Sequence, residues 1–255
     1  MDASRADEFL MPEGAATSPV YAENLRISYG KVDAVRGIDL DVRAGEVVGL
    51  LGGNGAGKSS TLRAISGVNP PTSGTLIVAG CDMASAAQAE AAQRVVGYTP
   101  DVGGLVRQAT PREHIALALS CRGRQDEMPY ALELLNQFGL DHVADRDTSG
   151  FSHGMSRRLS VLLAALTAQK VLALDEPFDG VDPIGVSATK TILKQAQEAG
   201  IAVLISTHLL PLLVDVSDRI IVMREGTLVT SGPPDLFAGR AGEMRYDALL
   251  RGTAT

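Results

Sequence analysis

One short glycine-rich string constrains this chain more than any other feature of the sequence. It reads Gly52-Gly53-Asn54-Gly55-Ala56-Gly57-Lys58-Ser59 and satisfies the pattern GxxxxGK[ST]. An apolar run at 47–51 precedes it, and a helical pattern follows it. Glycines let a backbone wrap closely around phosphate, while the lysine reaches the β- and γ-phosphates and the serine hydroxyl can hold Mg²⁺. The string therefore predicts a nucleotide-phosphate site between a buried strand and a helix.

Two adjacent acids form the second signal. The apolar residues 171–174 are followed by Asp175 and Glu176. Two carboxylates side by side at the end of a buried strand repel each other unless one faces a cation. Asp175 is therefore the candidate partner of Mg²⁺, and Glu176 is the candidate base that polarises the attacking water. Alone, such a strand end also fits a helix cap or a salt-bridge partner.

Short β-rich runs alternate with longer helical patterns from residue 20 onward, which predicts an α/β fold with a mostly parallel central sheet. The runs at 171–174 and 201–206 are continuously apolar, as expected of strands buried on both faces. The strands before residue 80 and the turn at 70–74 predict an antiparallel β flap beside that sheet. Residues 220–223 and 227–230 predict a late hairpin around Glu225-Gly226.

Residues 20–240 are predicted to form one domain. Residues 1–19 are interpreted as a flexible N-terminal tail and residues 241–255 as a C-terminal tail. Within the domain, leucines at helical spacing predict a helical subdomain inserted at about 101–168. Pro111 suits the first turn of one helix, and Asp182-Pro183 suits the start of another.

Composition excludes several classes of protein. The 255 residues are 45% hydrophobic and 21% charged, as in an ordinary globular chain, and the net charge of −7 disfavours a nucleic-acid partner. Cys81 and Cys121 form no CxxC pattern, so a zinc site is not indicated and a reducing cytoplasm is expected. The longest apolar stretch, about 14 residues at 201–214, is shorter than the roughly 20 that a membrane span needs.

In their order along residues 20–238, these motifs resemble the nucleotide-binding ATPase subunit of ABC transporters, a P-loop NTPase. Three further segments carry the resemblance: 151–155 resembles the signature usually written LSGGQ, 178–183 the loop between the two subunits, and 206–208 the histidine switch. Tyr29 stands where an aromatic residue stacks on adenine. By itself, Ser152 before a helix also fits an ordinary N-cap.

The resemblance implies a head-to-tail homodimer or heterodimer that holds two ATP molecules, each between the phosphate loop of one subunit and the signature of the other. Lys58, Glu176 and His208 would be catalytic. Ser59, Asp175 and Asp101 would place Mg²⁺. The residues expected to bind ATP are Tyr29, Gly52, Gly53, Asn54, Gly55, Ala56, Gly57, Lys58, Ser59, Ser60, Ser152 and Gly154.

Several residues depart from the family pattern. Phe151, His153 and Met155 replace the usual Leu, Gly and Gln of the signature, a form that resembles multidrug, antibiotic or polysaccharide exporters more than importers. His153 is interpreted as a solvated side chain. Asp101 stands where the family commonly has a glutamine that senses Mg²⁺; an aspartate is one methylene shorter and carries a charge.

These observations predict a cytoplasmic, Mg²⁺-dependent ATPase that powers an ABC transporter, with export as the expected direction. Its membrane-spanning permease is expected to be a separate polypeptide that holds it at the cytoplasmic face of the membrane. The alternative is a soluble ABC-type ATPase of a complex-assembly system, for example iron–sulfur cluster biogenesis.

Overall fold

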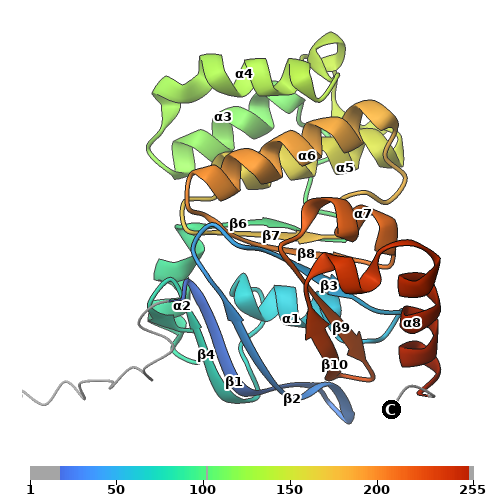
Figure 1. The fold of residues 1–255 in the computed structure, drawn as a ribbon. Coiled ribbons are helices and arrows are strands. Elements are labelled where there is room, and N and C mark those ends of the chain that lie inside the picture. The colour runs from blue at the N-terminus through green and yellow to red at the C-terminus, as the bar shows by residue number, and fades with distance from the viewer. Residues whose placement is uncertain (1–17, 102, 253–255) are drawn as a thin grey trace, which may run out of the picture.

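A six-stranded sheet forms the centre of the molecule, and helices α3–α6 lie over one of its faces (Figure 1). The computed structural model describes residues 18–101 and 103–252. In spatial order the strands are β10 (Thr227–Gly232), β9 (Arg219–Arg224), β3 (Val47–Leu51), β8 (Ala202–Thr207), β7 (Val171–Asp175) and β6 (Val96–Thr99). Every pair is parallel except β9–β10. The predicted parallel sheet and late hairpin are therefore confirmed.

The predicted antiparallel flap is also present, as a second sheet. Its strands are ordered β2 (Val32–Val42), β1 (Val20–Tyr29), β4 (Ser73–Val78) and β5 (Cys81–Asp82). Helix α1 (Lys58–Ile65) is sandwiched between this flap and the central sheet, where it contacts strands of both (Figure 1). The start of α1 is thereby fixed beside the carboxyl ends of the parallel strands.

Two apolar cores hold the central strands from opposite faces. Val47 and Leu51 of β3 pack into the core under the helices, whereas Val48 and Leu50 pack against α1 and the flap. The other inner strands alternate in the same way, so their continuous apolar runs reflect burial on both sides. A shift of one residue in the pairing of a strand would move its buried side chains to the opposite core. The packing therefore fixes the strand register and, with it, the positions of the strand ends.

The inserted helical subdomain contains α3 (Pro111–Cys121), α4 (Met128–Gln137) and α5 (His153–Thr167). Thr110 caps α3 through a capping box with Glu113, which adds to the expected Pro111 at its first turn. Helix α6 (Pro183–Glu198) begins at the predicted Asp182 cap, whose carboxylate accepts from Gly185 N at 2.9 Å. Helix-start chemistry thus sets the boundaries of these segments.

The tail prediction for residues 241–255 is wrong over most of its length. Residues 239–251 form α8 (Gly239–Arg251), whose Tyr246 and Leu249 are buried in the core under the helices. Charged residues at 240, 243, 245, 247 and 251 obscure the helical spacing of this buried face in the sequence. Of the N-terminal tail 1–19, residues 1–17 lie outside the described residues. Helices α2 (Ala86–Gln93) and α7 (Leu210–Val216) were not predicted.

The packing of α8 gives a stability test. Leu249→Ala should lower the free energy of unfolding by about 2 kcal/mol, because it leaves a cavity in the core. Met244→Ala on the same helix should change it by less than about 0.5 kcal/mol, because Met244 is 65% exposed. Urea unfolding followed by circular dichroism measures both. Equal, small effects of the two substitutions would show that α8 does not pack as described.

Candidate active site

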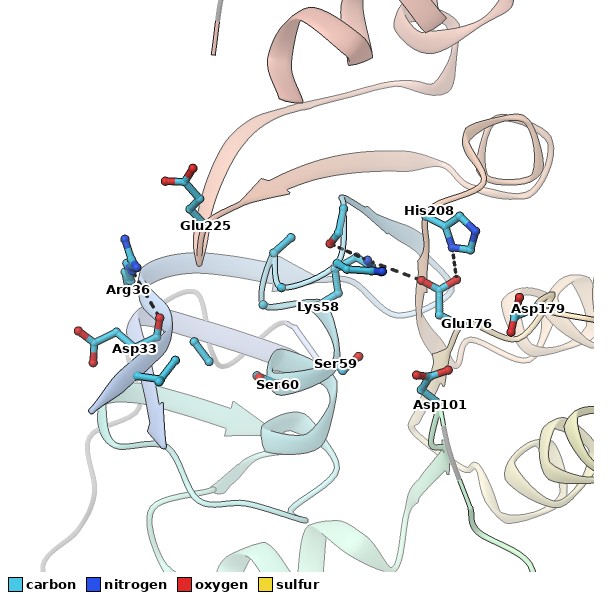
Figure 2. A pocket seen from close by; sticks show the side chains of 17 residues that line it. Asp33, Arg36, Lys58, Ser59, Ser60, Asp101, Glu176, Asp179, His208 and Glu225 are labelled. Atoms are coloured by element: carbon cyan, nitrogen blue, oxygen red, sulfur yellow. Dashed lines mark hydrogen bonds and ion pairs between the residues drawn. The ribbon is translucent and has the colours of Figure 1, made fainter. Parts of the chain in front are cut away.

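A cleft of about 720 Å³ opens at the carboxyl ends of β3, β7 and β8, where the phosphate-loop string meets the ends of the neighbouring strands. Figure 2 shows its labelled side chains, with Lys58, Glu176 and His208 close together and Asp33, Arg36 and Glu225 apart from them. The lining residues are Val32, Asp33, Ala34, Arg36, Gly53, Asn54, Gly55, Ala56, Gly57, Lys58, Ser59, Ser60, Asp101, Glu176, Asp179, His208 and Glu225.

Two glycines of the loop occupy positions that a side chain could not. A Cβ on Gly52 would lie 2.4 Å from the carbonyl oxygen of Met223. Gly57 has φ 103°, and a Cβ there would lie 2.6 Å from the carbonyl oxygen of Ala34. Gly57 is also the N-cap of α1 and has no side chain to satisfy the first helical N–H groups. The helix start is therefore left open to an anion, which its dipole favours.

Lys58 lies buried at the base of the cleft. Its Nζ donates to the carbonyl oxygens of Gly52 at 2.7 Å and Gly53 at 3.3 Å. The same Nζ is 3.6 Å from Oε1 of Glu176, which is itself only 13% exposed. Lys58 thus links the phosphate loop to Glu176, which directly follows β7.

Asp175 is fully buried, and its two carboxylate oxygens differ in their surroundings. Oδ1 accepts from Ser59 Oγ at 3.0 Å and also from Ser206 Oγ. Oδ2 has no hydrogen-bond partner among the described residues. Burial raises the pKa of this carboxyl above its ordinary value, and the hydroxyl donors only partly oppose that shift. A buried carboxylate oxygen without a donor, beside a serine hydroxyl, fits a hard divalent cation such as Mg²⁺.

Glu176 is held between two basic side chains. Figure 2 shows Lys58 and His208 approaching its carboxylate, with His208 Nδ1 3.1 Å from Oε2. Its backbone has φ 48°, a conformation that costs a non-glycine residue on the order of 1–3 kcal/mol. Its N–H donates to the carbonyl oxygen of Ser206 at 3.0 Å. The backbone is thus held in a strained form that aims the carboxylate into the cleft.

The structure places Asp101 in the cleft, where its carboxylate contacts an arginine. Its Oδ1 lies 3.1 Å from Nη2 of the buried Arg157 on α5. Arg157 was not a sequence candidate, and no local signal marks it, because its partners lie 18 to 57 positions away. Asp101 therefore lines the cleft as expected, and its pairing with Arg157 was not predicted.

Four predicted ATP contacts lie outside the lining of this cleft: Gly52, whose carbonyl oxygen accepts from Lys58, and Tyr29, Ser152 and Gly154. Tyr29 is 42% exposed, accepts from Asn69 Nδ2 at 3.1 Å and pairs across the flap with Val32, which does line the cleft. Ser152 caps α5 by accepting from Met155 N at 3.2 Å, as its alternative interpretation predicted. A Cβ on Gly154 would lie 2.5 Å from the carbonyl oxygen of Gly180, so the signature packs closely against the loop at 178–183.

The histidines divide into two kinds. His153 is exposed, as expected, and its Nε2 lies 3.1 Å from Oδ2 of Asp179. His114 is a satisfied structural residue: Nε2 accepts from Val106 N at 2.9 Å, so Nδ1 donates to Thr110 O at 2.8 Å.

The far end of the cleft is lined by three residues that were not predicted, Asp33, Arg36 and Glu225.

Comparisons with known proteins agree with this geometry. The family model described as ABC transporter matches residues 35–179. The lipopolysaccharide export system ATP-binding protein LptB of Haemophilus influenzae is 34% identical over 84% of this chain and 90% of that protein. The methionine import ATP-binding protein MetN of Cupriavidus metallidurans is 34% identical over 80% of this chain and 60% of that protein.

A solved structure of an ATP-binding subunit of an ABC transporter superposes with a TM-score of 0.81 at 26% identity, covering 93% of this chain and all of that chain. Because the relatives include an export and an import protein, they support the family without singling out the multidrug or antibiotic exporter type. The chain therefore belongs to the ABC transporter family, as an ATP-binding subunit with ATPase activity.

Proposed function

We propose that this ATPase powers an exporter, with the residues around Glu176 as its hydrolytic centre. The observation that carries the proposal is the convergence of Lys58, His208 and the Ser59–Asp175 pair on one strand end. The likeness to LptB proteins, named for lipopolysaccharide export, supports the direction. The named relatives are transporter proteins, so the assembly-system alternative is not favoured.

The residues divide the chemistry among them. Lys58 and the N–H groups at the start of α1 bind the β- and γ-phosphates of ATP, in place of the carbonyl contacts that Lys58 makes now. Glu176 accepts the proton of the attacking water, and His208 holds the γ-phosphate and orients the Glu176 carboxylate. Ser59 and Asp175 would hold Mg²⁺, which supplies positive charge that offsets the charge of the phosphates.

A second subunit completes the site. Ser152 and Gly154 do not line the cleft of their own chain, yet they lie at the N-terminus of the 15-residue helix α5. That helix start suits an anion presented from outside. In a head-to-tail homodimer or heterodimer, each signature therefore faces the phosphates bound by the other subunit. The contact between Gly154 and Gly180 places the loop at 178–183 beside the same surface.

Exposed apolar side chains mark where a membrane-spanning subunit docks. Val106 and Leu117 are 56% and 59% exposed; the N–H of Val106 donates to His114 of α3, and Leu117 lies in the second turn of that helix. A short helix of the permease would cover them and hold the subunit at the cytoplasmic face. In the described residues, no helix is both long and apolar enough to span a bilayer.

Asp175→Asn tests the buried carboxylate. At pH 7.5 without metal, the substitution should raise Tm by about 2 to 4 °C, because a buried oxygen without a donor no longer carries charge. Since burial raises the pKa of Asp175, the wild type loses stability as the pH rises above the ordinary carboxyl range. The gain from the substitution should therefore shrink toward pH 4. Differential scanning calorimetry in EDTA measures the Tm of both proteins at pH 7.5 and pH 4. A lower Tm for Asp175→Asn at both pH values would contradict the interpretation of Asp175 as a destabilising buried carboxylate.

Glu176→Gln should keep ATP binding and lower hydrolysis by a factor on the order of 10² to 10⁴, because an amide cannot accept the proton of water. Phosphate release measures hydrolysis, and size-exclusion chromatography with ATP should show a stable dimer. Glu225→Gln, at the far end of the same cleft, is the matched control and should remain active. Wild-type hydrolysis by Glu176→Gln would refute its role.

The docking surface is tested by Val106→Glu and Leu117→Glu together. The double variant should lose membrane association and keep its basal ATPase activity, because neither side chain lines the cleft. Co-expression with adjoining genes, followed by membrane fractionation, measures this. Met244→Glu, an equally exposed position on α8, is the control. If the wild type instead remains with a soluble scaffold protein, the assembly-system alternative replaces the exporter.

A further inference from the structure

One buried arginine joins three elements around the hydrolytic centre. The side chain of Arg157, in the second turn of α5, is only 3% exposed. Its Nη1 donates to the carbonyl oxygens of Pro100 at 2.7 Å and Asp175 at 3.2 Å. Its Nη2 donates to the carbonyl oxygen of Asp101 and lies 3.1 Å from the Oδ1 of that residue. A single guanidinium therefore ties α5 to the ends of β6 and β7.

The contact with Asp175 holds one side of the peptide that leads into Glu176. Arg157 binds the carbonyl oxygen of that peptide. The N–H of the same peptide donates to Ser206, to its carbonyl oxygen at 3.0 Å and its hydroxyl at 3.2 Å. Glu176 has φ 48°, a conformation that persists only where the surroundings hold it. Arg157 and Ser206 supply that hold from two sides.

A buried guanidinium also needs a counter-charge, and Asp101 supplies it. The Asp101 side chain is 42% exposed and lines the cleft while it pairs with the buried Arg157. A neutral glutamine at this position could accept a hydrogen bond but could not neutralise the arginine. The aspartate thus matches the buried arginine in charge.

We propose that Arg157 is a positioning residue that sets the Glu176 carboxylate for hydrolysis, with Asp101 as its counter-charge at the cleft. This inference rests on the proposed role of Glu176 as the base. Lysine at position 157 keeps the charge, but its compact ammonium cannot span two carbonyl oxygens and a carboxylate as the planar guanidinium does. Arg157→Lys should therefore misplace Glu176 without disturbing the phosphate loop.

The test is steady-state ATPase kinetics at saturating Mg²⁺. Arg157→Lys should lower kcat at least tenfold and leave the KM for ATP within about twofold. The matched control is Arg219→Lys, since the Arg219 guanidinium also binds a carboxylate, Glu46, and a carbonyl oxygen, Asp41, but at the amino ends of the parallel strands, away from the cleft. It should keep kcat within about twofold. Equal losses in the two variants would reduce Arg157 to a structural role and overturn the proposal.

A double-mutant cycle tests the counter-charge. Asp101→Asn should lower kcat, and adding it to Arg157→Gln should lower kcat no further, because both act through one contact. Additive losses overturn the proposal, as does an Asp101→Asn variant that shifts only the Mg²⁺ concentration for half-maximal activity. If the arginine variants fail to fold, the kcat and Mg²⁺ dependence of Asp101→Asn alone decide between these outcomes.

Glu176→Gln, measured alongside, separates the two levels of inference. If it stalls hydrolysis while Arg157→Lys behaves like wild type, only the positioning role fails. If Glu176→Gln itself hydrolyses ATP normally, the proposed hydrolytic centre fails, and the positioning proposal fails with it.

Discussion

The carboxylate of Asp175 is the point on which the cleft depends. It accepts from Ser59 at the start of α1 and from Ser206 on β8, and these two bonds join the phosphate loop to two strand ends. The parallel register pairs Asp175 with Ser206, so the hydroxyl faces the carboxylate because of strand alignment. That register is fixed by apolar side chains packed on both faces of the sheet. The cores under and over the sheet thus determine the geometry of a polar site at its edge.

The same arrangement is unfavourable for stability. Asp175 is buried with one oxygen that lacks a donor among the described residues, and Glu176 has a positive φ. Both features cost folding free energy, and neither improves packing. They persist because the flanking strand residues are fully buried and hold the chain in place. Local strain beside a nucleotide cleft is what an enzyme site under functional constraint is expected to show.

Sequence alone identified the parallel sheet, the flap, the helix starts and most cleft residues, because those features have local signals. The phosphate loop and the Asp175-Glu176 pair are contiguous, and parallel topology brings strand ends together. It missed β6, with four residues, and α7, with seven, because such short segments show too little periodicity. It also misread α8 as a tail. Arg157 escaped notice for another reason: an arginine near a signature looks like a solvated helix face until its distant partners are known.

Helix α5 links the two ends of the proposed mechanism. It begins after Ser152, whose end of the helix faces a second subunit in the proposed dimer, and it carries Arg157 beneath the peptide of Glu176. Five residues of helix span about 7.5 Å, and a hydrogen-bonded helix transmits a shift along its axis with little loss. Contact of the signature with the partner's nucleotide would therefore shift Arg157 and, through it, Glu176, the proposed catalytic base of the same subunit. The loop that carries Asp179 and Gly180 packs against the same helix start, so that signature and cleft can respond together.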